Sequence, residues 1–168
     1  MLRLPFLLFL SFVAAQYNYI EIIQNLDNAS GGCEHCPKDP NCIFVSNSWY
    51  CKNEIKMAWE YAKVKCPRTG GILADFPDRA TLVEVMGKFG CELWIGATVP
   101  VAYKLPSIYW SWLTGYGIPE DMWVPDAPTG TSFCAFASCE CVNKNITGCI
   151  GMKNADCSFK KGHICRYD

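Results

Sequence analysis

The sequence predicts a secreted α+β domain that is held together by disulfides. Three observations lead to this prediction. The chain has 168 residues, a length that suits one domain. Two helix-like stretches are followed by several short strand-like stretches with long loops between them, which is typical of α+β folds. The cysteines all follow an apolar N-terminal segment, and their even number, 12, favours a disulfide framework.

The N-terminal segment, residues 1–15, has the pattern of a secretory signal peptide. Arg3 gives a positive start, residues 4–13 are almost continuously apolar, and the small residues Val13 and Ala15 favour cleavage after Ala15. This apolar run is shorter than the roughly 20 residues that a membrane-spanning helix needs, and no later segment meets that length. We therefore expect a secreted, extracellular protein without a membrane span.

The charge balance of the mature chain argues against one class of partner. Without residues 1–15 the chain keeps 14 basic and 16 acidic residues, which gives a net charge of −2. Nucleic-acid binding needs a basic face, so we expect no nucleic-acid partner.

Residues 16–41 are polar and contain Gly31-Gly32 and two prolines, so we expect an irregular arm ahead of the main domain at residues 42–168. Cys33, Cys36 and Cys42 would staple its end. With His35 they could also be drawn as a zinc site, but an oxidising compartment favours disulfides. Two Asn-X-Ser/Thr sequons predict glycosylation, at Asn28 in this arm and at Asn145.

The first half of the main domain predicts one strand and one helix. FVSNSWYC at 44–51 alternates large apolar with small polar residues, which indicates a strand. NEIKMAWEYAKVKC at 53–66 predicts a helix with Asn53 as its N-cap and an end at Pro67. The inner face of this helix would contain Ile55, Trp59, Ala62 and Cys66.

A second helix is predicted at residues 78–90, DRATLVEVMGKFG. Asp78 can cap its start and Gly90 can end it. Its inner face would contain Leu82, Val85, Met86 and Phe89. A short buried strand or turn is predicted before this helix at GILADF (71–76), and a strand is predicted after it at CELWIGA (91–97).

Residues 99–133 are rich in proline, glycine and tryptophan, and they predict a long loop region that is interrupted by the strand-like IYWSWL at 108–113. Long loops in a compact domain are usually functional. Beyond them, CAFA (134–137), CIGM (149–152) and HICRY (163–167) predict short strands.

Several of these stretches resemble the motifs of a C-type lectin-like domain, in the order that this family has. The stretches are WYC (49–51), GGILADF after Cys66, the capped second helix, WIGA (94–97), WSWLTG (110–115) and HICRY (163–167). The resemblance covers about residues 42–167 and implies the C-type lectin-like fold in its long form. We expect Trp94, Trp110 and Trp112 to lie in the core, because a domain with little regular structure needs large apolar side chains.

The resemblance also implies three disulfides, Cys66 with Cys165, Cys134 with Cys157, and Cys42 with Cys51. Cys149 is a rival of Cys134 for Cys157. The remaining cysteines can pair in 15 ways, and the sequence does not choose among them. They are Cys33, Cys36, Cys91, Cys139, Cys141 and Cys149.

Calcium-dependent members of the family place Glu-Pro-Asn or Gln-Pro-Asp after a tryptophan, and a later strand adds Trp-Asn-Asp. Here the loop led by Trp123 has Ala127-Pro128-Thr129, and the later strand has Met152-Lys153-Asn154. Alanine offers no ligand, the lysine repels a cation, and Ca²⁺ needs about 6–8 oxygens. We therefore expect no metal and no cofactor, although calcium remains possible through a shifted alignment with Asp126 and Asp156 as ligands.

Catalytic motifs are few. The only histidines are His35 and His163, and the sequence has neither G-x-S-x-G nor H-E-x-x-H. Asp75 lies close to Asp78, but Asp78 is explained as a helix cap. We therefore expect a protein that is not an enzyme.

The expected function is recognition of a glycan or an extracellular protein. The predicted patch is the loop from Tyr116 to Thr129, with residues 138–148 beside it. Trp123 could contact a ligand or could instead pack the loop onto the core. Two alternatives stay open, a calcium-dependent lectin with a non-standard site and a structural or matrix interaction module. The candidate ligand-binding residues are Trp123, Asp126, Thr129 and Asn154.

Overall fold

A computed structural model describes residues 39–100, 109–139 and 150–168. The chain divides into two compact units, Met1–Cys36 and Pro37–Asp168, and the described residues belong to the second. The predicted signal peptide, the arm up to residue 38, both sequons and the Cys33–Cys36 group lie outside the described residues. Within the described residues, no helix has the length and apolar character needed to cross a membrane.

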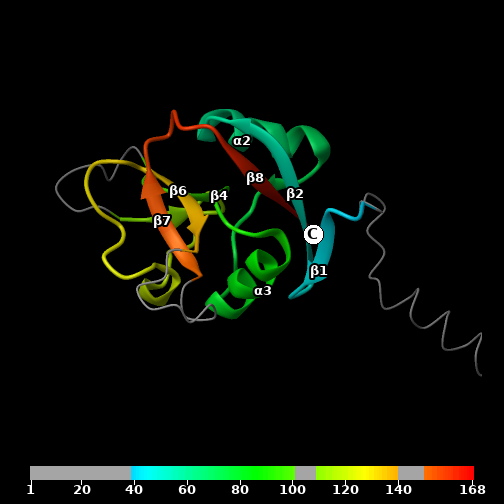
Figure 1. The fold of residues 1–168 in the computed structure, drawn as a ribbon, viewed down its shortest axis with the longest axis horizontal. Coiled ribbons are helices and arrows are strands. Elements are labelled where there is room, and N and C mark those ends of the chain that lie inside the picture. Colours follow the sequence, from blue (N-terminus) through cyan, green and yellow to red (C-terminus); the bar gives the residue numbers. More distant parts are fainter. Residues whose placement is uncertain (1–38, 101–108, 140–149) are drawn as a thin grey trace, which may run out of the picture. The chain divides into compact units, whose positions relative to one another are not determined.

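The fold is α+β, and the described residues form a mixed sheet and two α-helices (Figure 1). The sheet order is β1-β2-β8-β4-β6-β7, with β3 added to β8 and β5 added to β4. β4 and β8 pair in parallel, and the other pairs are antiparallel. The elements are β1 (Cys42–Val45), β2 (Ser48–Met57), α2 (Trp59–Lys65), η1 (Cys66–Thr69), β3 (Ile72–Leu73), α3 (Arg79–Phe89), β4 (Leu93–Thr98), β5 (Ser111–Trp112), η3 (Glu120–Met122), β6 (Cys134–Ser138), β7 (Gly151–Ala155) and β8 (Lys161–Tyr167).

The stretch FVSNSWYC is a hairpin, so the prediction of one strand at 44–51 is wrong. Val45 pairs with Ser48, and the two residues between them, Ser46 and Asn47, have φ angles of 48° and 64°. Two successive left-handed residues make the turn whose twist matches a two-residue hairpin loop. The alternation of apolar and polar residues continues across this turn, which is why the sequence reads as a single strand.

The helix predicted at 53–66 begins six residues later, at Trp59. Residues 53–57 belong to β2, where Asn53 pairs with His163 and Met57 pairs with Lys161. Asn53 is therefore not an N-cap, and Ile55 is 63% exposed instead of facing the core. The backbone groups of this segment bond to β8, and tertiary pairing of this kind overrides a local helical pattern.

The second predicted helix is confirmed as α3. The carboxylate of Asp78 accepts a hydrogen bond of 2.8 Å from the Thr81 N–H, and the predicted inner-face residues are all buried. Gly90 follows the helix with a φ angle of 78°, a conformation that glycine adopts readily. Local capping and periodicity were sufficient here because α3 depends on few distant contacts for its boundaries.

Two hydrophobic clusters make up the core. α3 packs into the larger cluster with Trp110 and Trp112, and α2 packs into the smaller one with Trp94. All three tryptophans are buried, as predicted. Gly96 of the WIGA stretch has a packing role, because a Cβ there would overlap the backbone carbonyl oxygen of Leu73.

Four disulfides join the described residues. Three are the pairs that the family resemblance implies, Cys42–Cys51, Cys66–Cys165 and Cys134–Cys157. The fourth, Cys91–Cys139, joins two of the cysteines that the sequence left unassigned. Cys66–Cys165 spans 99 residues and closes the longest loop of the four, so it removes the most freedom from the unfolded chain in the entropic account of disulfides.

Candidate functional site

The loop between β5 and β6 is fixed to the sheet at its middle. The Val124 N–H donates a hydrogen bond of 3.0 Å to the Met152 carbonyl of β7, and Trp123 forms an isolated bridge with the same residue. Met122 and Val124 are buried on either side of Trp123. These anchors place residues 125–132 at the surface as a short excursion with both ends held.

Trp123 packs the loop onto the domain. Its ring meets Trp110 edge-on, with 4.9 Å between the ring centroids, and it lies against the larger hydrophobic cluster. The side chain is half-buried, so part of the ring remains in contact with solvent. Of the two roles that the sequence left open for Trp123, packing is the one visible in this geometry.

Residues 124–128 form a tight turn at the tip of the loop. The Ala127 N–H donates to the Val124 carbonyl at 3.1 Å, Asp126 adopts a left-handed φ angle of 64°, and the Ala127–Pro128 bond is cis. Asp126 and Pro128 are exposed, and Ala127 is half-buried. The turn therefore presents one carboxylate to solvent and no second carboxylate beside it in the chain.

Asn154 of β7 holds the far side of this loop. Its side-chain carbonyl accepts a hydrogen bond from the Thr129 N–H at 2.9 Å. Its NH₂ group donates to the Thr129 carbonyl at 2.6 Å and to the Ser132 carbonyl at 2.9 Å. Both donors of the amide are thus engaged with the protein backbone. Asn154 fixes the loop, a role that the sequence did not suggest because its partners lie 22 and 25 residues away.

A small cavity of about 230 Å³ opens beside this clamp. We call it the long-loop pocket. It is smaller than the roughly 300–1,000 Å³ of typical ligand sites, and its indole wall, proline wall and few polar groups can contact part of a ligand. Its lining residues are Trp110, Pro128, Gly130, Ser132 and Asn154.

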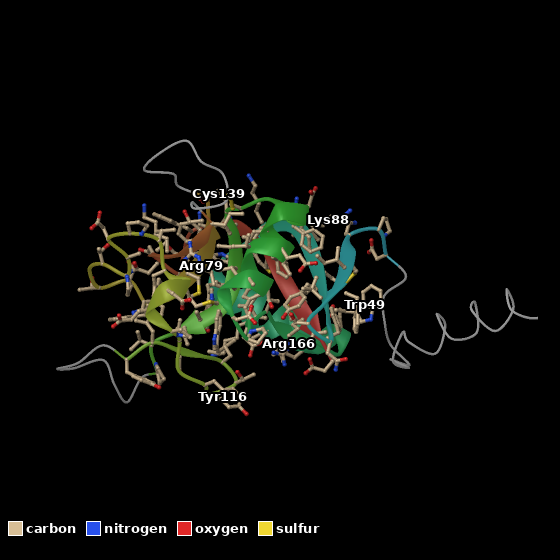
Figure 2. All side chains as sticks on the ribbon, turned by 90° about the horizontal axis from the view of Figure 1, so that it is seen from below. Trp49, Arg79, Lys88, Tyr116, Cys139 and Arg166 are labelled. Atoms are coloured by element: carbon tan, nitrogen blue, oxygen red, sulfur yellow. A yellow bond between two sulfur atoms is a disulfide. The ribbon has the colours of Figure 1, made fainter. Side chains whose placement is uncertain are left out.

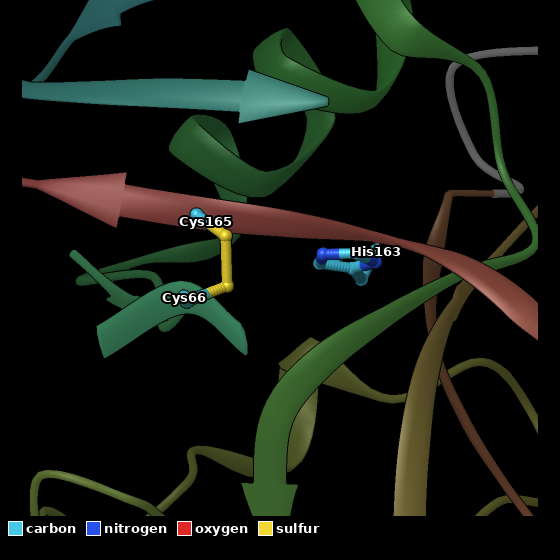
Figure 3. A group of neighbouring side chains, drawn as sticks. All are labelled: Cys66, His163 and Cys165. Atoms are coloured by element: carbon cyan, nitrogen blue, oxygen red, sulfur yellow. A yellow bond between two sulfur atoms is a disulfide. The ribbon is translucent and has the colours of Figure 1, made fainter. Parts of the chain in front are cut away.

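Among the described residues, potential metal ligands gather in one group. The chemistry of this group does not suit a metal ion. Cys66, His163 and Cys165 have their ligand atoms within 4.8 Å of one another (Figure 3). The two sulfurs are joined to each other in a disulfide, and a metal would need them as thiolates. Asp126 and Asp156, the acids of the shifted calcium alignment, are not members of this group, and Asp156 accepts the Ser158 N–H at 2.8 Å.

His163 is fully buried in β8, and neither ring nitrogen has a hydrogen-bond partner among the described residues. Burial lowers the pKa of His163, the nearby backbone of Ile55 opposes this shift, and the charge of Lys65 lowers the pKa further. The imidazole is therefore neutral at physiological pH. It lies beside the Cys66–Cys165 disulfide without a carboxylate to orient it, an arrangement that does not match an acid–base pair.

A second polar centre, which the sequence did not single out, lies around Asp75. This carboxylate is 5% exposed and forms an ion pair with Arg166 of β8. The Thr114 hydroxyl donates to its second oxygen at 2.6 Å. Because the Tyr50 hydroxyl is buried beside this centre, its pKa is raised. One signal was present in the sequence, a charged residue inside the apolar run ILADF, since buried acids are rarely left unpaired.

Comparison with known proteins gives a match in structure but not in sequence. No protein-family model matches the sequence, and neither does any curated protein. A calcium-independent type II antifreeze protein has 19% identity and a TM-score of 0.60, over 78% of this chain and 92% of that one. SPL-1 in complex with GlcNAc has 19% identity and a TM-score of 0.63, over 80% and 97%. The carbohydrate-recognition domain of mouse scavenger receptor C-type lectin has 21% identity and a TM-score of 0.62, over 79% and 96%.

Proposed function

We propose that this chain, which has the fold of a C-type lectin-like domain, acts by binding a glycan or an extracellular protein without a calcium cage. The fold alone does not choose the ligand. Its structural neighbours include a protein solved with GlcNAc, one solved with an N-glycan, and antifreeze proteins, one of them calcium-independent. The choice therefore rests on the residues of the long loop.

The observation that carries the proposal is that the side-chain amide of Asn154 is already bonded to the backbone of the long loop. Both N–H donors of its amide and its oxygen bond to the backbone of Thr129 and Ser132, so the group holds the loop without help from a cation. Ala127 supplies no side-chain oxygen, and Lys153 brings a positive charge next to Asn154. A Ca²⁺ ion would lack the several carboxylate oxygens that it requires.

The ligand would instead be held by short-range contacts. The long-loop pocket has apolar walls at Trp110 and Pro128, and the exposed part of Trp123 lies next to Trp110. Asp126 and Thr129 are exposed and offer a carboxylate and a hydroxyl. Because the loop is held by Asn154 before any ligand arrives, little conformational entropy would be lost on binding.

The test is a glycan array probed with the mature protein in EDTA and, in parallel, in calcium. The proposal expects equal binding in both buffers and at least a tenfold loss on Asp126→Asn, with Phe159→Ala as an exposed control outside the loop. Sugar binding that needs calcium would overturn the proposal. If no glycan binds, an extracellular protein captured by the unchanged chain, and not by Asp126→Asn, would identify the ligand as a protein.

One observation favours the second candidate, a structural or matrix interaction module. Ile55 of β2 is 63% exposed, and Tyr61 and Val64 of α2 are 72% and 51% exposed. Aromatic residues such as Tyr61 are enriched at contacts between proteins. This candidate predicts that Tyr61→Ala abolishes capture of the partner and that Asp126→Asn leaves it unchanged, which is the opposite of the result expected for the long loop.

A further inference from the structure

We propose that a second cavity, which we call the Asp75 pocket, binds one neutral saccharide unit independently of calcium and of the long-loop pocket. It has a volume of about 370 Å³ and shares no lining residue with the long-loop pocket. Figure 2 shows Tyr116 and Arg166, which both line it, along the same edge of the domain. The lining residues used below are Asp75, Phe76, Trp112, Thr114, Tyr116 and Arg166.

The polar side of the pocket can both donate and accept hydrogen bonds. The two terminal nitrogens of Arg166 bond to Asp75 and to Asp168. Each terminal nitrogen carries a second N–H, so the guanidinium keeps donors for a ligand that brings an acceptor oxygen. The carboxylate oxygens of Asp75 bond to Arg166 and Thr114, and each keeps a lone pair for a further donor. A hydroxyl group, which donates and accepts, matches both requirements.

The charges of the pocket indicate that this ligand is neutral. Asp75 and Arg166 form an ion pair, so their charges largely cancel within the lining. Asp168, which also bonds to Arg166, is mostly exposed and lies outside the lining. A charged ligand would lose its hydration without gaining a net counter-charge, whereas neutral hydroxyl groups lose less.

The apolar side of the pocket is formed by aromatic rings on a rigid support. Trp112 meets Phe76 edge-on, and both are almost fully buried. Tyr116 is 75% exposed, but its backbone is held, because the Trp112 N–H donates to its carbonyl at 2.8 Å. An exposed ring on a fixed turn can cover the C–H face of a sugar at a small entropic loss.

Neighbouring glycines show how the turn is built. The Gly115 N–H donates to the Trp112 carbonyl at 2.9 Å, and Gly115 has a left-handed φ angle of 92°. At Gly117 a Cβ would overlap the hydroxyl of Tyr109.

The volume of the pocket lies near the lower end of the roughly 300–1,000 Å³ that ligand sites occupy, which suits a single ring better than an oligosaccharide.

The experiment uses the mature, oxidised protein in EDTA and methyl glycosides of glucose, galactose, mannose and N-acetylglucosamine. Saturation-transfer NMR detects the bound glycoside, and the amide shifts of Gly115 and Gly117 locate it. We expect at least one glycoside to shift these two amides. We expect Tyr116→Ala to weaken its binding at least tenfold and Thr114→Val to weaken it severalfold.

Two control proteins make the result decisive. Phe159→Ala removes an exposed ring elsewhere, Asp126→Asn alters the long loop, and neither should change the affinity. Near-UV circular dichroism checks that both variants are folded. If Thr114→Val does not fold, the result of Tyr116→Ala decides the test, because Tyr116 is exposed. Absence of any glycoside-induced shift at Gly115 and Gly117 would overturn the inference. So would equal binding by Tyr116→Ala and Phe159→Ala, or loss of binding on Asp126→Asn alone.

Discussion

Asn154 on β7 and Arg166 on β8 each hold an earlier loop of the chain, but they do so by different interactions. Asn154 is partly exposed and makes neutral hydrogen bonds to the backbone of Thr129 and Ser132. Arg166 is mostly buried and pairs with the buried carboxylate of Asp75. Water can replace the first set of bonds when the loop opens, whereas the Asp75 carboxylate, which is 5% exposed, is left with little hydration when its partner is lost.

The two candidate binding regions, the long loop and the Asp75 pocket, therefore depend on the rest of the fold in different ways. The long loop can lose its clamp and disorder locally, because its ends remain held by Val124 and by β6. The Asp75 pocket cannot lose its ion pair without destabilising the domain, because the Asp75 carboxylate is 5% exposed and has its counter-charge on Arg166 of β8. Local and global unfolding measurements should therefore separate the two regions.

The largest effect is expected from Arg166→Met. This change leaves the Asp75 carboxylate buried without a counter-charge, which should lower the free energy of unfolding by about 3–5 kcal/mol. Urea unfolding of the oxidised protein measures it. Arg68→Met, at an exposed position, is the matched control. The double variant Asp75→Asn with Arg166→Met should recover part of the loss, and a single-variant effect below about 1 kcal/mol would contradict this account of the ion pair.

A smaller and local effect is expected from Asn154→Ala. Three hydrogen bonds are lost, but the backbone groups they satisfied can reach water, so we expect a loss of about 1–2 kcal/mol. Hydrogen exchange at the Thr129 amide should become much faster, while exchange in α3 stays close to that of the unchanged protein. If α3 and Thr129 are deprotected together, the loop is not an independent unit and the comparison fails.

His163 provides a pH-dependent case, because its ring is fully buried in β8 and burial lowers its pKa. Its pKa is lowered in the folded state, whereas the unfolded chain takes up a proton below about pH 6.5. The contribution to stability is therefore complete above about pH 6.5 and falls as the pH drops toward the lowered value. The slope is at most about 1.4 kcal/mol per pH unit. Thermal unfolding between pH 7.5 and 5.5 should show this slope, and His163→Leu should reduce it.

The smallest effect concerns the helix cap. Asp78→Ala should cost about 1 kcal/mol, because the Thr81 N–H loses its acceptor at the start of α3. Asp78→Ser keeps an acceptor and should cost less. An equal loss for both variants would show that the capping bond contributes little.

Features set by nearby residues could be predicted from the sequence, and features set by distant partners could not. The cap at Asp78 and the inner face of α3 depend on residues within one or two turns, and both are confirmed. The start of α2 was predicted wrongly because residues 53–57 pair with β8, more than 100 residues away. The ion pair of Asp75 was missed for the same reason, since Arg166 lies 91 residues further along the chain.

The same limit applies to the candidate site. The order of the family motifs located the long loop, and the residue types at Ala127 and Lys153 argued against a calcium cage. The sequence nevertheless offered Asn154 as a ligand-binding residue, because nothing in its neighbourhood reveals the backbone of Thr129 as its partner. Side-chain to backbone contacts across 25 residues leave no pattern in a single sequence.

The central claim is that the long loop is held by Asn154 and needs no calcium. The direct measurement is isothermal titration of Ca²⁺ into the mature protein after treatment with EDTA, repeated with Asp126→Asn. We expect no binding heat up to millimolar Ca²⁺ with either protein, because the loop offers one exposed carboxylate and an amide already engaged. Millimolar or tighter binding that disappears in Asp126→Asn would contradict the claim.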